Sequence, residues 1–429
     1  MDINLFFALL GSLLVLAFVA NRLVRFTRVP DVIILMATGV VIGPVLHWVN
    51  PDIFRGASHG FGSLALILIL FEGGLDLKLR EILKHFGSGF FLSLFSYVLC
   101  MSAVATVCRL ALHFSTLNAL LIGAVLGCIS SAILLPVLQQ VRLRREVKVT
   151  LLVEASFGDA LAVLAVTTLL DVAAGGSADP RRVAWVLGSS LVLAVTAGIL
   201  AGMLWSYLLP VLSEERFWHV LTFAALLLVY SGVHFMKGND LVSVLVFGLT
   251  LTNFQAVRKR LHFDEFAGSD WFHETPVKGQ DGSAPNHPNA QMLTFHGELA
   301  FLLRTFFFVL LGTLVNYAEM RKNTLLALLC FAAILVARVV AVQAGRLAWR
   351  SFSPLERELM VWFVPRGLIT AVLGIEVLEA RGADFAFLPS LAFALVVLTN
   401  LVLLVGTVRA RNLPPPEPEA VKAEPELAT

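Results

Sequence analysis

Long apolar runs alternate with short polar connections along almost the whole chain. Because about 20 apolar residues span the hydrocarbon core of a bilayer, the pattern predicts an all-α polytopic membrane protein with about thirteen transmembrane helices. The predicted helices occupy residues 3–21, 30–48, 60–76, 87–111, 116–139, 148–172, 183–209, 216–235, 239–254, 294–316, 323–345, 358–379 and 385–408.

Basic residues cluster in every second connection, beginning with the one that follows the first apolar run. Cytoplasmic connections of membrane proteins carry an excess of Lys and Arg, so these connections are assigned to the cytoplasm. The N-terminus is then outside and the C-terminus is in the cytoplasm. The clusters lie at residues 22–28, 78–84, 142–148, 216, 258–260, 346–350 and 409–411.

Two polar segments fall outside this repeating pattern. Residues 253–291 form a long connection rich in Gly, Pro, Asp, Asn and His, which we expect to be a cytoplasmic surface loop. Residues 413–429 are rich in Pro and Glu and have no apolar face to bury, so they are expected to be a disordered cytoplasmic tail. The transmembrane domain is therefore predicted to occupy residues 1–412. No attached regulatory domain is expected, and regulation by a separate subunit stays open.

Composition supports a lipid environment and excludes several classes of function. Hydrophobic residues make up 58% of the chain, charged residues only 14%, and the mean hydropathy is +0.84. A net charge of +2 argues against a nucleic-acid partner. The four cysteines are isolated within apolar runs, and no nucleotide-binding or hydrolase motif occurs, so we expect no enzyme activity and no cofactor.

The run from Thr150 to Thr168 contains two acids, Glu154 and Asp159, inside a predicted span. An ionisable residue at membrane depth is costly and therefore marks a functional-site candidate. The two acids are five residues apart, which places them about 140° apart around a helix. They cannot face the same point.

Two predicted spans, the fifth and the twelfth, are interrupted at matching places. The fifth contains Ser130 and Ser131 with Pro136 beyond them, and the twelfth contains Pro365 and Gly367. Pro removes a backbone donor, so both helices can unwind at these points. Matched interruptions in two halves of a membrane protein indicate inverted repeats with two crossed discontinuous helices and a transporter binding site.

Arg366 lies inside the second interruption and stays charged at membrane depth, so it must find a carboxylate or a group of carbonyl oxygens. Glu154 and Asp159 are the nearest acids by depth. One acid can face Arg366 while the other faces an ion path. The alternative is a single inert salt bridge among the three residues.

Four further charged residues within apolar runs are secondary candidates. Glu72 and Arg338 lie toward the cytoplasmic ends of their spans, where Glu72 can cap or pack and Arg338 can extend toward the interface. Glu298 and Arg304, six residues apart on the tenth span, can pair with other helices.

Five segments resemble the sodium/proton exchanger branch of the monovalent cation/proton antiporter superfamily. They are LILILFEGGLDL, SSAILLPVL, VEASFGDALAVL, RTFFFVLLGTLV and VPRGLITAVL, in the family's order. The resemblance implies that Asp159 is a shared cation and proton site and that Glu154 pairs with Arg366. It also implies a homodimer in which a mobile core domain, residues 87–172 and 323–408, moves against a dimerisation domain, residues 1–76 and 183–316.

The sequence departs from this family at two places. Gly158 stands where the family has Asn or a second Asp, and Ser130 and Ser131 stand where many members have Thr-Asp-Pro. Both changes remove oxygen ligands from the expected site and leave the identity of the cation open.

Together these features predict an antiporter in the bacterial inner membrane, surrounded by lipid, that contributes to pH homeostasis. A buried acid favours its protonated form, so a proton competes with Na⁺ or K⁺ for Asp159, with oxygens from Ser130 and Ser131 as further ligands. One carboxylate for one charge implies electroneutral exchange. Two alternatives stay open: a sodium-coupled organic anion carrier of related fold, and a membrane sensor or scaffold with a vestigial ion site.

Overall fold

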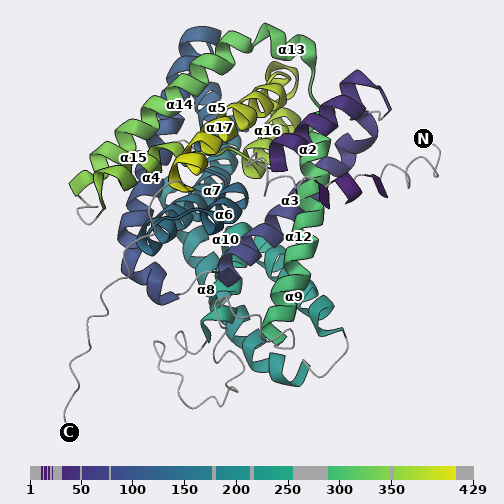
Figure 1. The fold of residues 1–429 in the computed structure, drawn as a ribbon, viewed down its shortest axis with the longest axis vertical. Coiled ribbons are helices and arrows are strands. Elements are labelled where there is room, and N and C mark those ends of the chain that lie inside the picture. The colour runs from purple at the N-terminus through teal and green to yellow at the C-terminus, as the bar shows by residue number, and fades with distance from the viewer. Residues whose placement is uncertain are drawn as a thin grey trace.

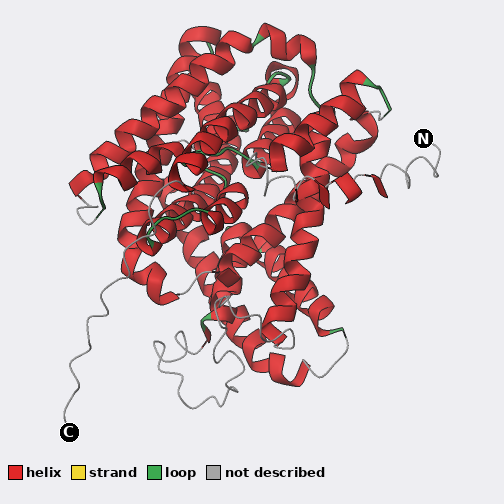
Figure 2. Cartoon of the chain, in the orientation of Figure 1, coloured by secondary structure: helices red, strands yellow, loops and turns green. Residues whose placement is uncertain are grey.

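The computed structural model describes residues 31–48, 51–76, 79–175, 180–212, 217–254, 288–347 and 352–411, with short stretches between 11 and 22. Every regular element in these ranges is a helix (Figure 2). Most of the first predicted span, residues 255–287 of the predicted loop and the 413–429 tail lie outside the described residues.

The described elements have the following bounds: α2 Asp31–Val40, η1 Val41–Val45, α3 Pro51–Asp76, α4 Leu79–Leu112, α5 Thr116–Gly127, α6 Ser131–Gln140, α7 Arg145–Ala173, α8 Pro180–Leu212, α9 Trp218–Phe235, α10 Asp240–Thr252, α12 Pro288–Thr313, α13 Tyr317–Lys322, α14 Thr324–Ala344, η2 Gly345–Leu347, α15 Pro354–Trp362, α16 Leu368–Arg381, η3 Gly382–Phe385 and α17 Leu388–Arg411.

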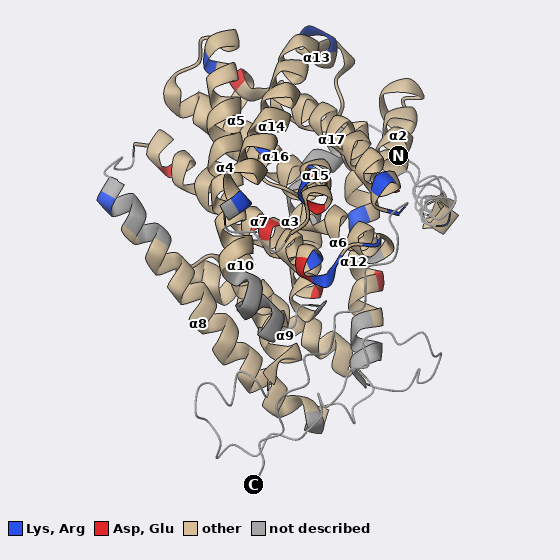
Figure 3. Ribbon diagram, turned by 60° about the vertical axis from the view of Figure 1, so that its left-hand side comes forward, with Lys and Arg blue, Asp and Glu red and all other residues tan. Residues whose placement is uncertain are grey.

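The described residues contain eight helices long and apolar enough to cross a membrane, and three shorter apolar helices. Over the described part of the bundle, Lys, Arg, Asp and Glu appear as short coloured segments on a ribbon that otherwise carries other residues (Figure 3). The predicted all-helical membrane fold is therefore confirmed, while the count of thirteen spans stays a prediction. The eight candidate spans are Gly87–Leu112, Thr116–Leu138, Arg145–Ala173, Gly188–Leu209, Trp218–Phe235, Thr294–Thr313, Thr324–Ala344 and Leu388–Arg411.

The helices pack in two groups (Figure 1). In the first group α4 contacts α5, α7 and α14. In the second group α3 contacts α10 and α12; α10 also contacts α8, and α12 also contacts α2. Close approach within the second group requires glycine, since a Cβ on Gly39 of α2 would lie 2.8 Å from the Cα of Gly312 on α12. The assignment of these groups to a mobile and a dimerising domain stays a prediction.

Both predicted interruptions are present. Helices α5 and α6 are separated by residues 128–130, and α15 and α16 by residues 363–367. The two gaps are in direct contact, because the Ser130 N–H donates a 2.8 Å hydrogen bond to the Pro365 carbonyl. A buried helix end needs such partners for its unpaired backbone groups.

Pro136 does not cause the first interruption, since it lies inside α6. Its missing N–H leaves the carbonyl of Ala132, four residues earlier, without its helical donor. That carbonyl accepts a 3.2 Å hydrogen bond from Nη1 of Arg304 on α12. The proline thus creates an acceptor that joins α6 to α12.

Candidate ion-binding site

Asp159 lies in the middle of α7 and is 2% exposed. Its Oδ2 accepts hydrogen bonds from the Ser131 hydroxyl, at 2.5 Å, and the Ser131 backbone N–H, at 3.2 Å. Ser131 is the first residue of α6, so the carboxylate faces the positive end of that half-helix. The other oxygen, Oδ1, is buried and has no hydrogen-bond partner among the described residues.

Ser130, predicted as a second ligand beside Ser131, has a different position. It is the buried residue that precedes α6, and its backbone N–H donates to the Pro365 carbonyl in the interruption between α15 and α16. A Cβ on Gly367 would collide with the Ser130 side chain, so the second interruption can approach only because residue 367 is glycine. Of the two serines, Ser131 is the one that contacts Asp159.

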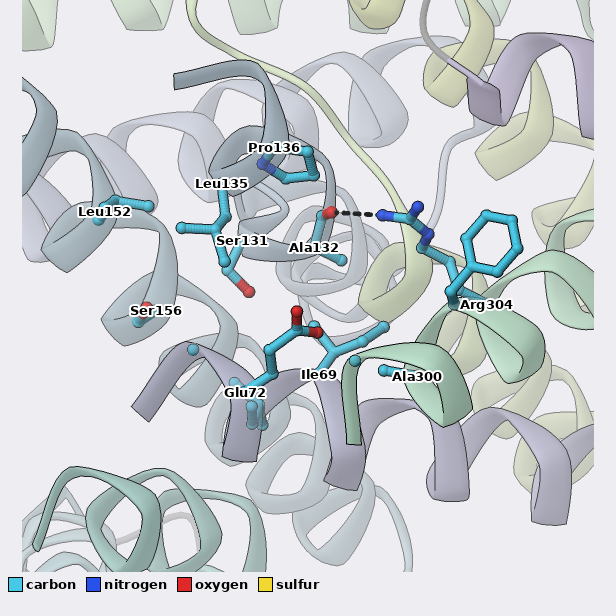
Figure 4. Close-up of a pocket in the computed structure, with 14 residues that line it drawn as sticks. Ile69, Glu72, Ser131, Ala132, Leu135, Pro136, Leu152, Ser156, Ala300 and Arg304 are labelled. Carbon is cyan, nitrogen blue, oxygen red and sulfur yellow. Dashed lines mark hydrogen bonds between the residues drawn. The ribbon is translucent and has the colours of Figure 1, made fainter. Parts of the chain in front are cut away.

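A pocket of about 230 Å³ adjoins Ser131 and is lined by residues of α3, α6, α7 and α12. Glu72 and Ser156 contribute its polar wall together with Ser131, and Arg304 lies at one side (Figure 4). The carboxylate of Glu72 points into this pocket (Figure 4). The pocket therefore brings a second acid, from the other packing group, toward the serine that binds Asp159.

The predicted ion pair between Glu154 and Arg366 is wrong. Glu154 pairs with Arg338 of α14, whose two terminal nitrogens both donate to its carboxylate, Nη2 at 3.1 Å. Arg338 is fully buried instead of extending to the interface, because the Met360 carbonyl at the end of α15 accepts from its Nε at 3.0 Å and from its Nη2 at 2.8 Å. The acid and the carbonyl together satisfy a guanidinium that water would otherwise solvate.

Arg366 is also fully buried, but none of the acids in the described ranges forms an ion pair with it. Its Nε donates a 2.8 Å hydrogen bond to the carbonyl of Leu126, in the last turn of α5, and Nη2 donates to Cys100 Sγ at 3.5 Å. Its Nη1 is buried without a hydrogen-bond partner among the described residues. The guanidinium therefore stabilises the negative end of α5 and also acts on Asp159 through its charge.

The remaining secondary candidates differ in their surroundings. Arg304 pairs with another helix, since its Nη2 lies 2.8 Å from Oδ2 of Asp31 at the start of α2. Glu298, on the same helix as Arg304, has an exposed side chain and does not line the pocket. Arg304 thus connects α2, α6 and α12 around the pocket.

Gly158, where the family resemblance predicts Asn or Asp, leaves space beside Asp159. A Cβ at this position would meet nothing closer than Ser93 Oγ at 3.7 Å and the Ile129 nitrogen at 3.9 Å. Ser93 Oγ is itself buried with no partner among the described residues. The backbone at position 158 can therefore carry a Cβ atom without collision.

Sequence reasoning did not single out Ser156, Asp31 or Ser93. Ser156 had a usable signal, because it precedes Asp159 by three residues and so shares its face of the helix. Asp31 and Ser93 carry no such signal. Their importance depends on which helices lie beside them.

Comparison with known proteins agrees with this architecture. The sodium/hydrogen exchanger transmembrane family matches residues 12–410, so the chain belongs to this family of membrane transporters. The K(+)/H(+) antiporter NhaP2 of Shewanella sp. (strain MR-4) is 24% identical over 97% of this chain and 69% of its own length. A probable Na(+)/H(+) antiporter 2 of Methanocaldococcus jannaschii is 24% identical over 87% of this chain and 84% of its own.

A solved structure gives the same fold. The sodium proton antiporter MjNhaP1 of Methanocaldococcus jannaschii, solved at pH 8, has a TM-score of 0.76 and 19% sequence identity, covering 96% of this chain and all of that chain. At this identity the likeness concerns the fold alone.

Proposed function

We propose that this protein is a secondary active antiporter that exchanges a monovalent cation, Na⁺ or K⁺, for H⁺, with Asp159 as the shared site. The observation that carries the proposal is the second carboxylate oxygen of Asp159, which is buried and has no hydrogen-bond partner among the described residues. A buried carboxylate must bind a proton or a cation to avoid the cost of an isolated charge.

The ligands around Asp159 suit an alkali cation. Hard cations prefer carboxylate, hydroxyl and carbonyl oxygens. Asp159 supplies a carboxylate, Ser131 a hydroxyl in direct contact with it, and the pocket adds Ser156 and the carboxylate of Glu72. Binding a cation excludes the proton from the same oxygen, and this competition couples the two fluxes.

The coupling also requires that only the neutral site crosses the membrane. An Asp159 that carries a proton or a cation is neutral, whereas the empty carboxylate is charged and is held back by the low dielectric. We propose that the group built on α4, α5, α7 and α14 carries the site in an elevator movement against α3, α10 and α12. The protein would act as a homodimer in the bacterial inner membrane, with its N-terminus outside.

The organic anion alternative is less compatible with the pocket. An anion would need an available cationic group, and Arg304, the arginine in the lining, is already bound to Asp31 and to the Ala132 carbonyl. The sensor alternative predicts no flux at all, so transport measurements separate it from antiport.

The direct test is proton flux in proteoliposomes on addition of Na⁺, K⁺ or Li⁺. Wild-type protein should move protons with at least one cation, and Asp159→Asn should abolish the flux while the protein stays folded. Asp171→Asn is the matched control, because Asp171 lies on the same helix with an exposed side chain. Flux at the wild-type rate in Asp159→Asn would refute the assignment of the site.

Electroneutral exchange is tested in the same proteoliposomes with an imposed membrane potential. One carboxylate that alternates between one proton and one cation moves no net charge, so the turnover rate should not change. A rate that rises steeply with the potential would require a second titrating acid, and Glu72 would be the first to examine.

A further inference from the structure

A second pocket, far from Asp159 along the chain, lies between the end of α14 and α15. It has a volume of about 370 Å³, within the range of about 300–1,000 Å³ that is usual for small-molecule sites. Its basic lining residues are Arg346, just after α14, and Arg357 on α15, and Gln343 adds a polar amide.

The two arginines have no acid of their own within the described part of the chain. The acid in the lining, Glu358, is already paired with Arg409 of α17, whose Nη1 lies 2.6 Å from its Oε1. The Arg409 guanidinium also lies 5.0 Å from the centre of the Trp362 ring. Two positive charges therefore remain in the pocket, which makes it suited to an anion.

One part of the pocket wall is apolar. Val339 and Val361 line it, and α14 is a candidate membrane span that ends at Ala344, just before Arg346. The outer face of this end of α14 is open, with Val336 63% exposed and Val340 46% exposed. Such a face contacts acyl chains, so the arginines lie where a span leaves the hydrocarbon and lipid phosphates begin.

From this combination we infer that the pocket binds the phosphodiester headgroup of an anionic phospholipid, held between Arg346 and Arg357, with an acyl chain along Val339 and Val361. Guanidinium groups bind phosphate oxygens through paired hydrogen bonds. A basic pocket at the end of a span is a recognised form of lipid-headgroup site. A soluble anion would use the arginines but would leave the apolar wall without a role.

The site would attach a lipid to the helix group that contains α14. Under the proposed elevator mechanism, this is the group that moves. Binding does not depend on the ion chemistry at Asp159, so the two proposals can fail independently. Neither arginine contacts the Asp159 site, and the lipid can be measured without any transport assay.

The test is lipid retention by the full-length protein, measured by native mass spectrometry with phosphatidylglycerol and phosphatidylcholine of matched chains. Each basic residue near anionic lipid contributes roughly a fivefold gain in affinity. Arg346→Gln and Arg357→Gln should therefore each weaken phosphatidylglycerol binding roughly fivefold, and the double variant roughly 25-fold. Phosphatidylcholine retention should not change.

Two control variants accompany these measurements. Arg321→Gln, an exposed arginine on α13, should bind phosphatidylglycerol like the wild type, and the charge-conserving Arg357→Lys should keep most of the affinity. Equal binding by the double variant and the wild type would overturn the proposal. So would full displacement of the lipid by millimolar inorganic phosphate, which would indicate a free-anion site, or a change in oligomer mass alone, which would indicate an interface between copies.

Discussion

The ends of two half-helices, α5 and α15, are each bound by a fully buried arginine, and the two environments differ. At the end of α15, Arg338 binds backbone carbonyls and the carboxylate of Glu154, so its charge is matched. At the end of α5, Arg366 binds the Leu126 carbonyl and a thiol, and one of its nitrogens has no partner among the described residues.

The difference separates structural support from function. A matched buried pair contributes no net charge to its surroundings, whereas the charge of an unmatched guanidinium acts on nearby acids. Asp159, whose Oδ1 has no hydrogen-bond partner among the described residues, is one of the acids on which Arg366 acts. Arg338 is therefore expected to hold the fold together, and Arg366 to influence the ion site.

The largest effect is expected on the Arg338 side. Glu154→Gln leaves a buried guanidinium without its counter-charge, which should lower the free energy of unfolding by about 3–5 kcal/mol. Adding Arg338→Gln should recover part of this loss, because the two residues are partners. Thermal unfolding in detergent measures both variants.

The matched control combines Glu154→Gln with Arg366→Gln. These residues share no contact in the structure, so their losses should add. A combined loss clearly smaller than the sum would restore the pairing predicted from the sequence and contradict the structure.

The next largest effect is expected at Arg366. Arg366→Gln removes the donor to the Leu126 carbonyl, which should cost about 1–3 kcal/mol of stability. Loss of a positive charge near Asp159 favours the protonated carboxyl, so the pH profile of exchange should move to higher pH. Arg338→Gln is the control: it should lower the yield of folded protein, but the folded molecules should keep the wild-type pH profile of exchange. If Arg366→Gln, Arg338→Gln and the wild type all have the same pH profile, Arg366 does not influence the ion site.

A smaller effect is expected at the other end of α15, where Glu356 binds Arg144 at 2.6 Å and caps the helix with Ser353. Burial alone would raise the pKa of Glu356, but the hydrogen bonds from Arg144 and Ser353 outweigh it and hold the pKa below its usual value. A lowered pKa means that the stabilisation is present above about pH 4.5 and is lost as the pH falls further.

The measurement is the unfolding temperature in detergent between neutral pH and pH 3.5. Glu356→Gln should flatten this pH dependence and cost roughly 1 kcal/mol or less at neutral pH. Glu358→Gln is the control, because Glu358 and its partner Arg409 are about half exposed, at 54% and 51%. If both substitutions change the pH dependence of the unfolding temperature equally, burial of the Glu356–Arg144 pair does not add to its stabilising effect.

The smallest effect is expected at Gly158, on the Asp159 side. Gly158→Ala adds only a Cβ, which meets nothing closer than 3.7 Å, so stability should change by less than about 1 kcal/mol. Gly123→Ala is the contrasting variant, because a Cβ there would collide with the Met101 carbonyl of α4. Comparable loss of folded protein in both variants would show that the space beside Asp159 is not available.

The sequence alone was enough for the fold class and for the places where two helices are interrupted. Apolar runs long enough to span a bilayer predict membrane helices, and the two interruptions were located to within a few residues. Glu154 and Asp159 were assigned to different faces of one helix, as observed, because a five-residue separation fixes their relative direction.

Only the tertiary structure decided which groups those residues contact. Helical periodicity gives the depth and direction of a side chain but not the helix that it faces, so it could not show that Glu154 faces Arg338 and not Arg366. Arginine is long and can be satisfied by a carboxylate or by carbonyl oxygens, which makes its partner impossible to read from residue type. The choice of Ser131 over Ser130, the Asp31–Arg304 pair and the Leu126 carbonyl all depend on contacts between segments far apart in the chain.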